Sequence, residues 1–113
     1  MVALDPAPPR LESMWAESLP ELSRPVKPLL APHPRLLALN DGLARDLRID
    51  PDAFRRAEGL LFLTGGLRSA GSSPVAQVYA GHQWGRFRPI LGDGRAALLG
   101  ERRDAEGVLR DIH

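Results

Sequence analysis

The chain has 113 residues, 43% of them hydrophobic and 26% charged, which fits one ordinary domain or a piece of a larger one. Fifteen Lys and Arg residues against fourteen Asp and Glu leave a net charge of +1, so the composition argues against a nucleic-acid partner. Cysteine is absent, which excludes disulfides and thiolate catalysis, and no apolar run approaches the ~20 residues of a membrane span. No signal core follows Met1, so we expect a cytoplasmic protein without a membrane partner.

Proline dominates the start of the chain. Eight of the eleven prolines lie within the first 34 residues. Proline fixes φ and removes a backbone donor, so we predict a proline-rich arm over residues 1–33. Within it, only a short helix around Trp15 is expected between residues 11 and 22, because Pro20 limits its length.

Helical patterns follow from residue 34 onward. Leucines at helical spacing predict a helix that is capped near Asp41. Asp50 and Pro51 are typical of an N-cap and a first helical position, and they predict a second helix that ends at about Leu63, before two glycines. The same signal at 73–74 predicts a third helix through residues 75, 78, 79 and 82.

The last part of the chain changes its period. Residues 96–100 and 108–112 are short apolar or alternating segments, and a turn at Glu106 and Gly107 joins them. We therefore expect an α+β fold in which helices are followed by an antiparallel β-meander. A Pro-rich arm (1–33) would precede one globular unit (34–113).

The most specific local feature is Leu-Gly-Asp-Gly-Arg at 91–95, between two probable strands. Gly92 and Gly94 permit a close backbone approach, and consecutive N–H groups in such a turn form a nest for phosphate oxygens. Arg95 would add a guanidinium suited to phosphate. The competing interpretation is an ordinary Asp-Gly hairpin turn with Arg95 in solvent. The pattern alone leaves both open.

A second feature is Tyr-Ala-Gly-His-Gln-Trp-Gly at 79–85, at the expected end of the third helix. His82 is a candidate base or metal ligand. The favoured alternative makes His82 and Gln83 buried polar groups satisfied by the backbone, with Tyr79 and Trp84 packed beneath the sheet.

The remaining polar residues favour structural roles. We expect the Arg102–Arg103 pair on a solvated hairpin face, and Asp50 and Asp52 as helix caps. No arrangement of serine, histidine and aspartate predicts a nucleophilic triad, and no Gly-x-Ser-x-Gly elbow occurs.

YAGHQWG at 79–85 and RFRPILGDGRAALLGE at 86–101 together resemble the signature of the selenoprotein O family, protein adenylyltransferases with a kinase-like fold. The family more often has Phe at the position of Trp84 and Gln at that of Ile90. Its Leu-Ser-Gly-Asn segment is replaced here by LTGG at 63–66. The resemblance extends over about residues 30–113, through PHPRLLALNDGLARDLRID at 32–50.

The resemblance implies the N-terminal part of a protein-kinase-like fold, so residues 34–113 would be an incomplete N-lobe. Gly92, Gly94 and Arg95 fall on the family's ATP-binding positions, in its glycine-rich loop. The family transfers AMP from ATP to Ser, Thr or Tyr hydroxyls of proteins and uses Mg²⁺ or Mn²⁺.

The family's phosphate-binding lysine, catalytic aspartate and metal ligands come later than His113. The resemblance therefore implies no catalytic or metal-binding residue in this chain, which alone is expected to be inactive. The alternative is a non-catalytic truncated remnant that acts at most as a weak nucleotide-binding or interaction module.

Overall fold

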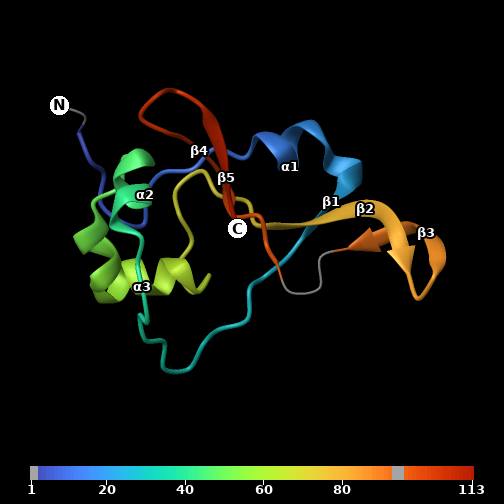
Figure 1. Ribbon diagram of the computed structural model, residues 1–113, viewed down its shortest axis with the longest axis horizontal. Coiled ribbons are helices and arrows are strands. Elements are labelled where there is room, and N and C mark those ends of the chain that lie inside the picture. The colour runs from blue at the N-terminus through green and yellow to red at the C-terminus, as the bar shows by residue number, and fades with distance from the viewer. Residues whose placement is uncertain (1–2, 93–95) are drawn as a thin grey trace.

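The structure, a computed structural model, describes residues 3–92 and 96–113 (Figure 1). Its helical elements come first and most of its strands come last, so the α+β prediction is confirmed. The helical elements are α1 (Met14–Ser18), η1 (Pro20–Leu22), α2 (Asp41–Asp46), η2 (Pro51–Arg55) and α3 (Ala57–Leu63), where η marks a 3₁₀-helix. The strands are β1 (Ser23–Pro25), β2 (Val75–Gln83), β3 (Arg86–Gly92), β4 (Gly100–Arg103) and β5 (Leu109–Ile112).

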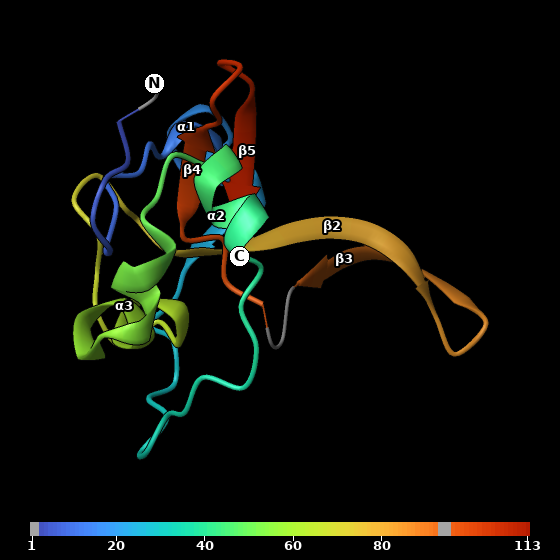
Figure 2. The same ribbon diagram turned by 60° about the vertical axis from the view of Figure 1, so that its left-hand side comes forward.

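The strands form two antiparallel sheets. The first has the order β1-β2-β3, so β2 lies in the middle with a neighbour on each edge. The second is the β4–β5 hairpin, in which Gly100 pairs with Ile112 and Arg103 with Leu109. The β2–β3 hairpin projects away from the rest of the molecule (Figure 2).

The core lies among the N-terminal segment, the helices and the residue that precedes β4. Phe54 of η2 and Phe62 of α3 stack with ring centroids 6.2 Å apart. This cluster is small, and Val75 and Ala76 of β2 are buried outside it. Its buried members are Ala7, Leu11, Ala44, Ile49, Ala53, Phe54, Phe62 and Leu99.

The N-terminal segment joins this core through backbone pairing with β4. Glu12 exchanges two backbone hydrogen bonds of 2.8 Å with Glu101. Gly100 permits this approach, because a Cβ at that position would collide with the Glu12 carbonyl oxygen. The buried Glu101 carboxylate also accepts from the backbone N–H groups of Met14 and Trp15, which begin α1. The proline-rich segment is thereby tied to the second sheet.

The first two of the helix starts predicted after residue 34 are confirmed, and the second of these helices has one break. The Asn40 side chain accepts from Leu43 N–H and caps α2, and the Asp50 side chain accepts from Asp52 N–H at the start of η2. Arg56 interrupts the second predicted helix, because its backbone is extended (φ −92°, ψ 163°). The segment is therefore a 3₁₀-helix followed by a separate α-helix.

The predicted third helix is wrong, since residues 75–83 form strand β2. Their apolar side chains fall at helical spacing, but valine and tyrosine also favour strands. Hydrogen-bonding partners on both edges of β2 then decide the outcome, because pairing with β1 and β3 satisfies its backbone. The apolar residues of this segment are therefore spaced as in a helix although the segment is a strand.

The strand predicted at 96–100 lies further along the chain, at Gly100–Arg103. The strand predicted at 108–112, near the end of the chain, is confirmed as Leu109–Ile112. The turn between them contains Glu106 and Gly107, as expected, and Gly107 has a positive φ of 83°.

Arg102 does not lie on a solvated face, so that prediction is wrong. Its side chain is 4% exposed, and it donates to the backbone carbonyls of Leu47, Arg10 and Arg48. It also forms an ion pair of 2.6 Å with Asp5. Four separate acceptors explain how a guanidinium is buried without an unpaired charge. Arg103, by contrast, is exposed as predicted.

Candidate functional site

The base of the predicted phosphate-binding loop is held by a single strand. Gly92, the last residue of β3, pairs with Val78 of β2. Leu98, beyond the loop, exchanges backbone hydrogen bonds of 2.8 and 3.0 Å with Val75 of the same strand. Both attachment points therefore lie on β2, three residues apart, or about 10 Å along an extended strand.

The two attachment points also share one edge of β2. Val75 directs both of its backbone groups to Leu98, and β1 occupies the other edge. β3 lies on the edge opposite β1. Gly92 and Leu98, on either side of the loop, are thus held at the same edge of β2.

Of the predicted phosphate-binding residues, only Gly92 lies within the described part of the chain. Gly92 is exposed, and a Cβ built on it would meet nothing nearer than the Gln77 carbonyl oxygen at 4.0 Å. Gly94 and Arg95 lie outside the described residues. The phosphate nest and the plain hairpin turn both stay predictions.

A cavity of about 470 Å³ lies beside the end of the loop, and we call it the loop-side cavity. Ala96 and Ala97, which follow the loop directly, form part of its wall. Lys27 and His113 are the basic side chains that line it. Among the described residues, no acidic side chain lines it, so its polar character suits an anion. The other lining residues are Val26, Pro28, Leu29, Leu63, Thr64, Gly65 and Leu99.

Sequence reasoning missed Lys27 and His113 as wall residues of this cavity. Lys27 is the only lysine in the chain, but it stands in the proline-rich segment and was assigned to the arm. Proline there does not detach the segment, because Val26 N–H donates to the Pro74 carbonyl just before β2. The signal that could have identified Lys27 as a wall residue was its being the one lysine of an arginine-rich sequence.

The 79–85 motif is not the buried polar cluster that the sequence favoured. Trp84 is 88% exposed, and both His82 and Gln83 are exposed. The His82 ring lies edge-on to Phe87, with centroids 5.7 Å apart, on the projecting hairpin. Within residues 3–92 and 96–113, no three His, Cys, Asp or Glu side chains come together as a group able to hold a metal ion. The described residues therefore do not fit an Mg²⁺ or Mn²⁺ site.

Among the described residues, two carboxyl groups have a shifted pKa, and local structure explains both. The Arg55 guanidinium, 2.8 Å from the Asp41 carboxylate, holds the pKa of Asp41 below its usual value. The backbone N–H of Val108, supported by Arg110, lowers the pKa of Asp104 in the β4–β5 turn. Neither residue lines the loop-side cavity. These shifts belong to turn and helix contacts.

No helix in the described part of the chain has the length and apolar character needed to cross a membrane.

Comparison with known proteins identifies the class. The family model described as "Protein adenylyltransferase SelO" matches residues 9–113. A relative from Corynebacterium efficiens, named protein nucleotidyltransferase YdiU, is 52% identical over 107 residues, which are 95% of this chain and 22% of the relative. Relatives of the same name from Mycobacterium sp. (strain KMS) and Nitrobacter hamburgensis are 50% and 48% identical, over 91% and 94% of this chain and 21% of each relative.

These matches define a family of protein nucleotidyltransferases. The chain belongs to the SelO family of protein adenylyltransferases, since the family model covers nearly its whole length. It spans about a fifth of the length of the curated relatives it matches. The match starts at residue 9 rather than near residue 30, so it includes most of the proline-rich segment.

Proposed function

We propose that this chain supplies the N-terminal, ATP-binding part of a kinase-like protein adenylyltransferase, which transfers AMP to Ser, Thr or Tyr hydroxyls of proteins. The observation that carries the proposal is the family match over residues 9–113. Gly92, Gly94 and Arg95 are the proposed ATP-binding residues. Mg²⁺ or Mn²⁺ would neutralise the phosphates, with ligands outside the described residues.

The anchored ends of the loop support this role. Backbone N–H groups bind phosphate oxygens well only when they are held in place beforehand, because an ordering cost would otherwise reduce the gain. The pairing of Gly92 and Leu98 to one edge of β2 provides such a base. The described side chains that line the adjoining loop-side cavity include no acidic group, so they do not repel the polyphosphate.

The reaction requires attack by a protein hydroxyl oxygen on the α-phosphorus of ATP. The new oxygen–phosphorus bond forms as the bond to the β-phosphate oxygen breaks, so pyrophosphate leaves and the hydroxyl proton passes to a base. We assign no base to this chain, whose proposed role is to hold and orient ATP. For this reason, we propose that the 113-residue chain alone does not transfer AMP.

The test replaces the matching segment of the Corynebacterium efficiens relative with residues 9–113 of this chain and measures ATP affinity by calorimetric titration. Gly94→Val should abolish binding, because a branched side chain blocks the backbone approach. Arg95→Ala should weaken binding by roughly 1–3 kcal/mol, the scale of a charge-assisted contact.

Arg88→Ala is the matched control, since it removes an exposed arginine from β3 while leaving the loop intact. Its affinity should equal that of the unmutated chimera. If Gly94→Val and Arg95→Ala both fold and both bind ATP normally, the loop is not the ATP site.

A further inference from the structure

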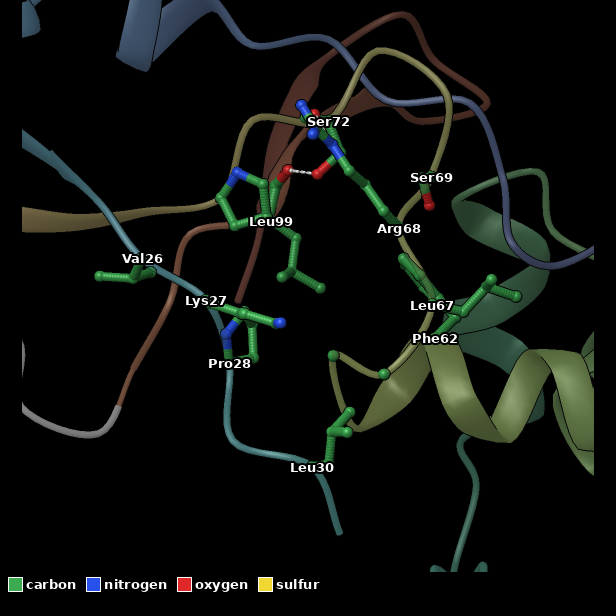
Figure 3. A pocket seen from close by; sticks show the side chains of 13 residues that line it. Val26, Lys27, Pro28, Leu30, Phe62, Leu67, Arg68, Ser69, Ser72 and Leu99 are labelled. Carbon is green, nitrogen blue, oxygen red and sulfur yellow. Dashed lines mark hydrogen bonds between the residues drawn. The ribbon is translucent and has the colours of Figure 1, made fainter.

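A second cavity, of about 370 Å³, lies between residues 26–30, the end of α3 and the 67–72 loop (Figure 3). We call it the Lys27 cavity, since Lys27 lines it as well as the loop-side cavity. Its volume falls in the range of small-molecule sites. Phe62, Leu67 and Leu99 supply apolar wall, so the body of a bound molecule would be apolar.

Lys27 provides a charged group in this cavity. Figure 3 shows its side chain reaching from the 26–28 segment into the open space. No ion pair of Lys27 occurs within the described residues, and no acidic side chain lines the cavity. An ammonium group against an apolar wall without a counter-charge is complementary to a carboxylate.

Ser69 provides a second polar group, on the opposite wall (Figure 3). It is 4% exposed, and its Oγ is buried with no hydrogen-bond partner in the described part of the chain. A buried hydroxyl without a hydrogen-bond partner raises the free energy of the folded state. Such a hydroxyl therefore indicates that a hydrogen-bonding ligand is missing.

Two other polar groups of this wall, Ser72 Oγ and Arg68 Nε, already have partners. Ser72 Oγ donates to the Leu99 carbonyl, and Arg68 Nε donates at 2.8 Å to the Ser72 carbonyl. These bonds hold the 67–72 loop against Leu99, the residue that precedes β4. Among the described residues, Ser69 is then the hydroxyl of this wall that is left without a partner. The wall is thus ordered before any ligand arrives.

We propose that the Lys27 cavity binds an aliphatic carboxylate that carries a second polar group. Its carboxylate pairs with Lys27, its chain lies along Phe62, Leu67 and Leu99, and its far polar group bonds to Ser69. The proposal does not depend on the adenylyltransferase role.

The experiment titrates the 113-residue chain with ω-hydroxy carboxylates of six to ten carbons, followed by calorimetry and by the shift in melting temperature. The comparison probes are plain carboxylates and plain alkanols of the same lengths. One length of hydroxy acid should bind best, about tenfold tighter than the matching acid and alkanol, since each lacks one polar contact.

The variants assign each contact. Lys27→Met should weaken hydroxy acid and plain acid alike, by about tenfold, while Arg88→Met, which also removes an exposed positive charge, should change neither. Ser69→Ala should reduce the hydroxy acid to the affinity of the plain acid and leave the plain acid unchanged. It should not lower the melting temperature, because the hydroxyl has no partner to lose.

The proposal is overturned if no probe binds at millimolar concentration, or if alkanols bind as tightly as hydroxy acids. It is equally overturned if Ser69→Ala leaves the advantage of the hydroxy acid intact, or weakens both acids alike through a structural effect.

Discussion

At the scale of single residues, Arg102 connects segments that lie far apart in the sequence. It joins Asp5 near the start of the chain to β4 and to the carbonyl oxygens of Leu47 and Arg48 after α2. The sequence alone favoured a solvated role, because an arginine pair in a hairpin is usually exposed. What buries Arg102 is a set of backbone carbonyls from distant segments, which no local pattern reveals.

We predict that Arg102→Met lowers the free energy of unfolding by about 3 kcal/mol, since it removes the ion pair with Asp5 and the hydrogen bonds to the carbonyl oxygens of Leu47 and Arg10. Arg103→Met is the matched control on the neighbouring, exposed residue, and it should change stability by less than about 0.5 kcal/mol. Urea denaturation of both variants measures this. Equal effects would mean that the contacts of Arg102 contribute nothing specific.

Trp84 is the second residue with an unusual position. It and Gly85 form the two-residue turn between β2 and β3, with φ angles of 56° and 73°. Both values are positive, as a type I′ turn requires, and asparagine suits the first position better than tryptophan does. Because Trp84 is 88% exposed, it gains little packing in return.

Trp84→Asn should therefore stabilise the chain by about 1 kcal/mol, the scale of removing a strained left-handed residue. Trp84→Phe retains the strain and should leave stability near its starting value. Thermal or chemical unfolding would show the difference, and a loss of stability in Trp84→Asn would indicate that the indole packs on the protein in solution.

At the scale of elements, the turn of the β4–β5 hairpin is organised by one carboxylate. Asp104 accepts hydrogen bonds from the backbone N–H groups of Glu106 and Val108 and pairs with Arg110. These contacts favour the ionised form, so the pKa of Asp104 is lowered by folding. The stabilisation is fully present above the ordinary pKa and is lost as the pH falls through the lowered one.

Asp104→Asn should consequently destabilise the chain most at neutral pH, and the difference should shrink as the pH falls below about 4. Unfolding free energies of both proteins between pH 7 and pH 2 give this curve. A difference that stays constant with pH would show that the charge of Asp104 is irrelevant and that only its shape matters.

Elements whose signals are local were predictable. Asp50 caps its helical turn because its side chain accepts a hydrogen bond from the backbone N–H of Asp52, two residues on. The turn at 106–107 was predictable because Gly107 adopts the positive φ that the turn needs. β2 was not predictable, because its helical spacing of apolar residues competes with pairing to β1, about 50 residues earlier. Lys27 was assigned to an arm for the same reason, since only tertiary contacts place it in a cavity wall.

At the scale of the whole molecule, the chain is more open than its length requires. Its radius of gyration is 15.4 Å, against about 13 Å for a compact domain of this size. The projecting β2–β3 hairpin and the irregular segment between β1 and α2 account for the difference (Figures 1 and 2). With a small core as well, we expect a broad melting transition of low cooperativity.

Limited trypsin digestion should first cut after Arg35, which is exposed in the irregular segment. The nearby Arg24 and Lys27 should resist, because each is followed by proline. Arg102, buried in β4, should be cut only after unfolding. Mass spectrometry of early fragments checks the order, and early cleavage at Arg102 would contradict this description of the core.

Label transfer tests the proposal that residues 9–113 hold ATP for transfer of AMP. The chimera that carries this segment in the Corynebacterium efficiens relative is incubated with Mg²⁺, a protein acceptor and ATP labelled at either the α- or the γ-phosphate. We predict that α-label becomes bound to protein and γ-label does not, and that the 113-residue chain alone transfers neither. Retained γ-label, or a folded chimera that transfers no label while the intact relative does, would contradict the account.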